Sequence, residues 1–245
     1  MHASAMENGK DFFATYGKFF DNATSPRVID VGAYDVNGSL REICPIGFSY
    51  VGVDFAAGKG VDVVLVDPYQ LPFEENSVDI VVSSSCFEHS EMFWLSFLEI
   101  LRILKPSGLV YINAPSGGSF HRHPVDCWRF YPDSGKALES WARRNGVNAL
   151  LLESFTQVGG EWHDYVAVFI KDASHADKVT DRILHHKKDF ENGHISGSNE
   201  VLRLRHYSQS QRRVRDLVFR RFAKLCRQVE SRVRRAKGYL SRSGR

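Results

Sequence analysis

The chain has few cysteines and no long apolar run. Its 245 residues include four cysteines, which have neither the spacing of metal ligands nor the density of a disulfide framework: Cys44, Cys86, Cys127 and Cys226. Such sparse thiols suit a reducing compartment. No apolar stretch approaches the roughly 20 residues that a transmembrane helix needs, and the first residues do not resemble a signal peptide. We therefore expect a cytoplasmic protein without a membrane span.

The sequence also lacks the G-x-G-x-x-G loop that holds the pyrophosphate of a dinucleotide. After the first predicted strand the chain reads Gly32-Ala33-Tyr34-Asp35, and the next glycine is Gly38. A nucleoside ligand without phosphates needs fewer glycines at this turn. The pattern therefore argues against hydride transfer, and a nucleotide-cofactor oxidoreductase is kept as an alternative.

Negative charge is scarce near the end of the chain. Residues 201–245 hold 15 Lys and Arg and two acids, a net charge of +13, whereas residues 1–200 carry −10. Residues 211–235 have apolar positions at helical spacing, which predicts a basic helix. We divide the chain into a domain at 1–172 and a linker with a basic helical tail at 173–245.

The basic tail has three interpretations. The first is packing on the body or on a second subunit, which would give a homodimer. The second is contact with an anionic membrane surface, which would place the protein peripherally at the inner membrane. Nucleic acid ranks last, because no RNA-binding module is visible.

Apolar runs alternate with helical patterns through the first 172 residues. This order predicts an α/β fold, a doubly wound Rossmann-like seven-stranded sheet that is mostly parallel and closes with an antiparallel C-terminal hairpin. The predicted strands are residues 27–31, 50–54, 61–66, 78–83, 109–113, 148–156 and 164–171, and the predicted helices are residues 10–20, 91–104 and 133–145.

The first two strands each end in a carboxylate, Asp30 and Asp54. Their continuous apolar runs are typical of a parallel sheet that is buried on both faces. An acid at the end of the second strand of such a sheet is well placed to accept from two ribose hydroxyls. The pair predicts a nucleoside-containing ligand at the carboxyl edge of the sheet.

Five sequence blocks then occur in order between residues 27 and 113. They are Val28-Ile29-Asp30-Val31-Gly32, Gly52-Val53-Asp54-Phe55, Asp67 with Leu71-Pro72-Phe73, residues 78–89 and residues 100–109. Together they resemble class I S-adenosylmethionine-dependent methyltransferases of the type 11 kind. The resemblance implies S-adenosylmethionine as cofactor. It also implies that Gly32 lets the backbone approach the cofactor and that Asp30 supports this loop or reaches the methionine amine through water. Tyr34 replaces the usual second glycine, so we expect a rebuilt loop around the methionine part.

Further cofactor roles follow from the same resemblance. Asp54 would take the ribose hydroxyls, and Phe55 would cover one face of adenine. Asp67 would accept from the adenine amine, while Ser84 and Ser85 would line the floor beneath the sulfonium. The structural alternatives are a turn at Asp67 and a core aromatic at Phe55.

Residues 119–133 follow the fifth strand, beside the expected transfer site. They contain two imidazoles, two carboxylates, two guanidiniums and several aromatics. An alcohol acceptor needs a base for its proton, and histidine is most easily poised near neutral pH. We predict His123 as that base and Asp126 as the group that orients it, with His89 and His121 as the other candidates.

The same segment suits a hydroxyl-rich ligand, because aromatic faces stack on sugars and charged groups take hydroxyls. We predict Trp128, Arg129 and Tyr131 as substrate-binding residues. The segment resembles one in methyltransferases of bacterial polysaccharide and natural-product clusters. The structural alternative is a loop locked by a pair such as Arg129 and Asp133.

A divalent metal held by His89, His123 and Asp126 was weighed, but spacing in a sequence cannot establish such geometry. We predict no metal site. The predicted activity is methyl transfer from S-adenosylmethionine to a hydroxyl of a sugar or other small hydroxylated acceptor, by direct displacement with general-base assistance. A methyltransferase of nucleic acid or another macromolecule, and a non-catalytic S-adenosylmethionine-binding module, are the alternatives.

Overall fold

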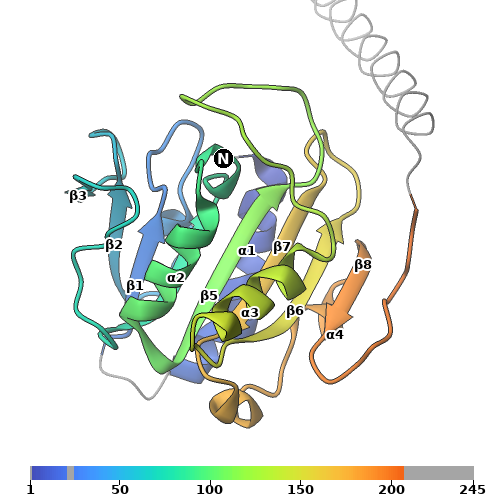
Figure 1. Cartoon of the computed structure of the whole chain (residues 1–245). Helices are drawn as coiled ribbons and strands as arrows, with labels where there is room; N and C mark the ends of the chain where they lie inside the picture. The colour runs from blue at the N-terminus through green and yellow to red at the C-terminus, as the bar shows by residue number, and fades with distance from the viewer. Residues whose placement is uncertain (1, 21–24, 207–245) are drawn as a thin grey trace, which may run out of the picture. The chain divides into compact units, whose positions relative to one another are not determined.

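A computed structural model describes residues 2–20 and 25–206, and the predicted basic helix at 211–235 lies outside them. One sheet crosses this part of the chain, with the strand order β3-β2-β1-β4-β5-β7-β6-β8 (Figure 1). Its strands are β1 (Arg27–Val31), β2 (Ser49–Asp54), β3 (Val63–Val64), β4 (Val78–Ser84), β5 (Leu104–Pro115), β6 (Leu150–Gln157), β7 (Asp164–Ile170) and β8 (Phe190–Ile195). The α-helices are α1 (Ala3–Tyr16), α2 (Phe93–Ile103), α3 (Ser134–Arg144) and α4 (Ile183–His186), and the 3-10 helices are η1 (Gly17–Phe20), η2 (Leu40–Ile43), η3 (Phe87–His89) and η4 (Ala173–Lys178).

The first five strands pair in parallel, and the later strands pair antiparallel. Strand β1 lies between β2 and β4, with Asp30 opposite Gly52 on one side and Val82 on the other. Strand β7 joins the sheet antiparallel to β5, and β6 follows antiparallel to β7. The mostly parallel α/β sheet with an antiparallel C-terminal part is therefore confirmed.

The prediction of seven strands was wrong, because β8 adds an eighth strand along β6. This strand lies in the part of the chain expected to be a linker, where Asn192-Gly193 has the sequence of a turn. In the structure Asn192 takes a φ of 53° inside β8, and the pairing with β6 shifts register between Ser154 and Thr156. The Asn-Gly pair thus makes an irregular strand rather than a turn that ends one.

Helices cover both faces of the sheet. The apolar cluster on one face joins the sheet to α2 and α3, and the cluster on the other face joins it to α1 and α4. Figure 1 shows α2 and α3 in front of the sheet and α1 behind it. Phe12 and Tyr16 on α1 are fully buried, and each such aromatic stabilises the fold by roughly 1.5–3 kcal/mol. The predicted helix at 10–20 therefore exists, with an earlier start at Ala3 and a 3-10 ending.

A buried carboxylate ties α1 to the far end of the chain. Glu153 on β6 accepts a hydrogen bond from the Tyr16 hydroxyl at 2.5 Å and from the backbone N–H groups of Ile183 and Leu184. Those two N–H groups open α4 and have no partner within the helix. Glu153 therefore links the first and fourth helices through the sheet. Within residues 2–20 and 25–206, none of the helices has the length and apolar character needed to cross a membrane.

Candidate functional site

The carboxyl ends of β1, β2, β4 and β5 meet at one edge of the sheet. Because these strands are parallel neighbours, the turns that follow them lie side by side. The chain leaves β1 toward β2 on one side and later enters β4 on the other, so this edge is a topological switch point of the sheet. Open α/β sheets bind ligands at such a switch point.

The turn after β1 presses against the turn after β4. Gly32 has a φ of 87°, and a Cβ built there would lie 2.4 Å from the Cβ of Cys86. The N–H groups of Gly32 and Ala33 both donate to the carbonyl of Val53, at 3.0 and 3.1 Å. Only glycine combines this backbone conformation with so close an approach. Gly32, which was predicted to let the backbone approach the cofactor, therefore cannot be replaced without moving Cys86.

Asp54 at the end of β2 links the first two turns. Its carboxylate accepts from the backbone N–H of Tyr34 at 3.3 Å and of Ala56 at 3.0 Å. An ionised carboxylate has about four acceptor positions, so capacity remains for ribose hydroxyls. Tyr34 and Phe55 are about half exposed beside it, at 47% and 53%. A carboxylate that accepts hydrogen bonds, flanked by accessible aromatic rings, is a set of side chains that fits a nucleoside.

Asp30 is buried within β1 rather than at the surface of the turn. It accepts a hydrogen bond from the Tyr50 hydroxyl of β2 at 2.7 Å. Burial raises the pKa of Asp30 to about 6, because the charged form loses its hydration. The Asp30 side chain thus joins β1 to β2, and its predicted role toward the cofactor loop stays a prediction.

The remaining predicted cofactor residues lie in two places. Asp67 follows β3 and accepts from the N–H of Tyr69 at 2.8 Å, which is the turn arrangement that we had weighed as an alternative. Ser84 ends β4, and its buried hydroxyl has no hydrogen-bond partner among the residues described. Ser85 has a φ of 54° and donates its N–H to the carbonyl of Asn113 at 2.9 Å. A buried hydroxyl without a partner is uncommon in folded proteins, so Ser84 stands out among the predicted cofactor residues.

The segment that follows β5, residues 116–131, is held against the sheet by its own backbone; we call it the acceptor loop. Phe130 returns to β5 by donating its N–H to the carbonyl of Pro115 at 2.8 Å. Cys127 donates its N–H to the carbonyl of Glu88 at 2.7 Å, so the loop also rests on η3. The segment that was predicted to lie beside the transfer site therefore contacts the residues that follow β4.

Asp126 anchors the acceptor loop from inside. Its side chain is 1% exposed and forms a bidentate pair with Arg129, at 2.5 and 2.8 Å. The carboxylate also accepts the backbone N–H of His121 at 2.8 Å. The Arg129 guanidinium lowers the pKa of Asp126 to about 2. We had expected Asp126 to orient His123, and the structure instead directs it to Arg129 and His121.

The three predicted histidines come together although they arise from two segments. The ring centroids of His89 and His121 lie 4.9 Å apart, and His123 lies 6.2 Å from each of them. Burial lowers the pKa of His89, which favours its neutral form. His123 is exposed, and its ring forms no hydrogen bond within the part of the chain that the structure covers. An imidazole with accessible nitrogens at this edge can exchange a proton with a bound acceptor.

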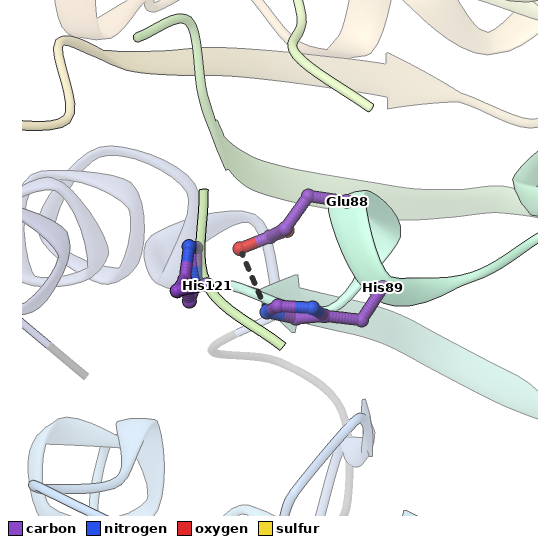
Figure 2. Close-up of side chains that lie close together, drawn as sticks. All are labelled: Glu88, His89 and His121. Carbon is purple, nitrogen blue, oxygen red and sulfur yellow. Dashed lines mark ion pairs between the residues drawn. The ribbon is translucent and has the colours of Figure 1, made fainter. Parts of the chain in front are cut away.

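Glu88 belongs to the same cluster and was missed as a site residue. Its side chain is 2% exposed and lies 3.7 Å from the Nε2 of His89 (Figure 2). Burial raises the pKa of Glu88 to about 8. A Glu-His pair after a buried strand was visible in the sequence. Its approach to His121 was not, because that contact depends on the path of the acceptor loop.

The predicted substrate-binding residues differ in their exposure and in the hydrogen bonds that already hold them. Trp128 is 37% exposed, donates its indole N–H to the carbonyl of Ser90 at 2.9 Å and packs edge-on to Phe93. Tyr131 is 55% exposed. Arg129 binds Asp126 and the carbonyls of Ser119 and Trp128, so it mainly holds the loop. The locking arrangement that we weighed is therefore present, with Asp126 in place of Asp133 as the acid.

Comparison with known proteins covers the part of the chain that forms the turns after β1, β2 and β4. Residues 21–112 match the sequence model of a family described as a methyltransferase domain. An uncharacterised methyltransferase of Mycolicibacterium vanbaalenii is 27% identical over 152 residues, 56% of this chain and 59% of that protein. One of Mycobacterium tuberculosis (strain H37Rv) is 31% identical over 112 residues, 41% of this chain and 44% of that protein. The chain thus spans about half the length of these relatives.

Over residues 21–112 the chain is therefore similar to a methyltransferase domain. In fold the chain is also similar to the [4+2]-cyclase SpnF, with a TM-score of 0.50, 13% identity and coverage of 68% of this chain and 80% of that one. The matched family region ends within β5, so the acceptor loop lies beyond it.

Proposed function

We propose that the protein transfers a methyl group from S-adenosylmethionine to a hydroxyl of a sugar or another small hydroxylated acceptor. The observation that carries the proposal is an exposed imidazole, His123, in a loop that also carries exposed aromatic side chains and that follows β5 at the carboxyl edge of the sheet. The likeness of residues 119–133 to a segment of methyltransferases from bacterial polysaccharide and natural-product clusters supports a glycan acceptor. S-adenosylmethionine, when bound, supplies an electrophilic methyl group.

The turns after β1, β2 and β4 would hold the cofactor. Asp54 offers acceptors to the ribose hydroxyls, and Phe55 offers an exposed ring face to adenine. Ser84 offers a hydroxyl at the end of β4 that has no hydrogen-bond partner among the described residues. Because the backbone fixes all three positions, little ordering remains to be done when the ligand binds.

His123 would take the proton of the acceptor hydroxyl as the new bond from oxygen to the methyl carbon forms. A neutral hydroxyl is a weak nucleophile, and base assistance of this kind is worth roughly 10²–10⁴-fold in rate. Asp126 does not orient this base, because it is committed to Arg129. It acts on the site by fixing the loop that carries His123.

The aromatic side chains of the acceptor loop would hold the acceptor. Phe120, Trp128 and Tyr131 are 75%, 37% and 55% exposed. Exposed rings in one loop are well suited to stack on the apolar faces of a sugar. Alignment of the methyl group with the acceptor would then account for much of the rate enhancement. Alignment alone lowers the activation barrier by several kcal/mol, about 7–11 in favourable cases.

The test begins with the acceptor. The purified chain is incubated with methyl-labelled S-adenosylmethionine and a panel of glycans and polar extracts, and the labelled product is identified by mass. We expect an O-methyl ether. Label on a ring nitrogen or on nucleic acid would contradict the proposal, as would cofactor binding without transfer to any acceptor.

The base is tested on that acceptor with His123→Ala. We expect turnover to fall roughly 100-fold while cofactor affinity is unchanged. His175→Ala is the matched control, because His175 lies in η4, away from the carboxyl edge of β1 and β4. Full turnover in His123→Ala would exclude this residue as the base.

A further inference from the structure

Three side chains beside the acceptor loop point toward one another: Glu88, His89 and His121 (Figure 2). Each offers one ligand atom, and these atoms all lie within 4.8 Å of one another. Glu88 and His89 belong to η3, directly after β4, whereas His121 comes from the acceptor loop. The cluster exists only because the loop folds back over the end of the sheet.

Backbone contacts determine which nitrogen of each imidazole carries the proton. The Nδ1 of His89 lies 2.5 Å from the carbonyl oxygen of Val125, and the Nδ1 of His121 lies 3.2 Å from that of Ser119. A carbonyl oxygen only accepts, so Nδ1 is the donor in both rings. The Nε2 atoms therefore carry lone pairs. Metal-binding histidines usually have this arrangement, in which a hydrogen bond at the other nitrogen orients the ring.

In the described part of the chain, one oxygen of the buried Glu88 carboxylate lacks a hydrogen-bond partner. The Glu88 side chain is 2% exposed, and within residues 2–20 and 25–206 its Oε2 has no hydrogen-bond partner. Its Oε1 lies 3.7 Å from the Nε2 of His89, which is too long for a hydrogen bond. Burial without a cation is costly for a carboxylate.

We propose that Glu88, His89 and His121 bind a divalent transition-metal ion through one carboxylate oxygen and two imidazole Nε2 atoms. Bonds of about 2.0–2.2 Å to nitrogen and oxygen place two tetrahedral ligands roughly 3.3–3.6 Å apart. The 3.7 Å spacing between Glu88 and His89 is near this value. Two histidines with one glutamate form a ligand set that Zn²⁺ and other first-row metals accept.

The surroundings of the cluster favour an ion of two positive charges. The Arg129 guanidinium acts electrostatically on Glu88, and its charge is balanced by the bidentate pair with Asp126. Asp126 also lies 3.4 Å from the Nδ1 of His121, where it supports that ring from the side away from Nε2. The positive charge of the ion would stabilise the ionised form of Glu88.

Three protein ligands leave at least one coordination position open. In a role that rests on the proposed function, this position would bind the acceptor hydroxyl oxygen and lower its pKa, so that His123 removes the proton more easily. Metal binding itself needs no acceptor, so its failure and the failure of the proposed function can be told apart.

The test titrates the purified full chain with Co²⁺ and follows visible absorbance, and it repeats the titration with Zn²⁺ by calorimetry. We expect one ion per chain and a cobalt spectrum of nitrogen and oxygen ligands. Glu88→Gln keeps the shape of the side chain but replaces the carboxylate, and we expect it to weaken binding at least tenfold; His121→Ala should do the same. Thermal unfolding and S-adenosylmethionine titration of Glu88→Gln check that this variant remains folded.

The matched control removes histidines from a different acid-histidine group. His185 and His186 contact Asp181 on the surface, with side chains 45% and 67% exposed. The double variant His185→Ala, His186→Ala should bind the metal as the unaltered chain does. The proposal is overturned if no saturable one-to-one binding occurs, if the double variant loses binding while Glu88→Gln retains it, or if the cobalt spectrum shows the charge-transfer band of a thiolate.

Discussion

The strand-end turns and the acceptor loop build their parts of the site in different ways. In the turns after β1 and β2, each polar group is positioned by residues close to it or by the adjacent strand, as where Asp54 accepts from Tyr34 and Ala56. In the acceptor loop the partners are distant in sequence, as where His89 contacts Val125 and Glu88 accepts from Cys127. A site built from residues that are close in sequence can be predicted from that sequence. Contacts between residues that are distant in sequence are seen only in the folded chain.

The largest expected effect concerns the tightest contact among the turns. Gly32→Ala combines a backbone conformation that costs an L-residue roughly 1–2 kcal/mol with a clash at Cys86, where overpacking costs roughly 1–3 kcal/mol more. We expect a loss of roughly 2–5 kcal/mol in the free energy of unfolding and a matching loss of cofactor affinity. Chemical denaturation and calorimetry measure the two.

Gly47→Ala is the control for that substitution. Gly47 has a φ of 92°, and nothing lies within 4 Å of a Cβ built there. It carries the backbone strain without the clash, so we expect a loss of about 1–2 kcal/mol and unchanged cofactor affinity. Equal losses in the two variants would show that the contact between Gly32 and Cys86 adds nothing.

The second prediction compares two carboxylates of the cofactor region. Asp54→Asn removes charge-assisted acceptors worth roughly 1.5–3 kcal/mol, and we expect S-adenosylmethionine affinity to fall about 10–100-fold. Asp67→Asn should cost less, because Asp67 already forms a turn with Tyr69. Calorimetric titration ranks them, and a larger loss in Asp67→Asn would reverse the assignment.

The third prediction concerns the anchor of the acceptor loop. Asp126→Asn breaks the bidentate pair with Arg129, and we expect the free energy of unfolding to fall by roughly 1–3 kcal/mol near neutral pH. The folded pKa of Asp126 is about 2, below its ordinary 3.8, so its contribution is present above pH 4 and lost as the pH falls toward 2. Denaturation across this range should show the gap to the unaltered chain closing.

Arg129→Lys tests the same ion pair from its other side chain. It keeps the positive charge and loses the planar fork that binds both carboxylate oxygens. We expect it to lose part of the stability that Asp126→Asn loses. A gap between the unaltered chain and Asp126→Asn that does not change with pH would contradict the role of this ion pair.

The smallest effect has the opposite pH dependence and belongs to the cofactor region. Burial raises the folded pKa of Asp30 from 3.8 to about 6. The folded state therefore holds its proton more tightly, and this contribution to stability is lost as the pH rises from about 4 to about 6. Asp30→Asn should lack that loss, which we expect to be about 1–2 kcal/mol. Parallel pH profiles for the two chains would contradict it.

The strand-end turns could be predicted from the sequence, whereas the contacts of the acceptor loop could be predicted only in part. The strands from β1 to β5 have long apolar runs or acids at their ends, and the predicted bounds of β1 match the structure. Strand β8 was missed because Asn192-Gly193 resembles a turn, and its strand pairing depends on β6. The histidine cluster was foreseen in part, and its fourth member Glu88 was not, because the path of the acceptor loop decides which side chains meet there.

The central claim is that cofactor binding and methyl transfer depend on separate regions of one sheet edge. The direct measurement is S-adenosylmethionine affinity and labelled methyl transfer, side by side, in Asp54→Asn and His123→Ala. We predict that Asp54→Asn loses affinity, and that His123→Ala keeps it while transfer falls roughly 100-fold. Loss of affinity in His123→Ala, or transfer at the unaltered rate, would contradict the account.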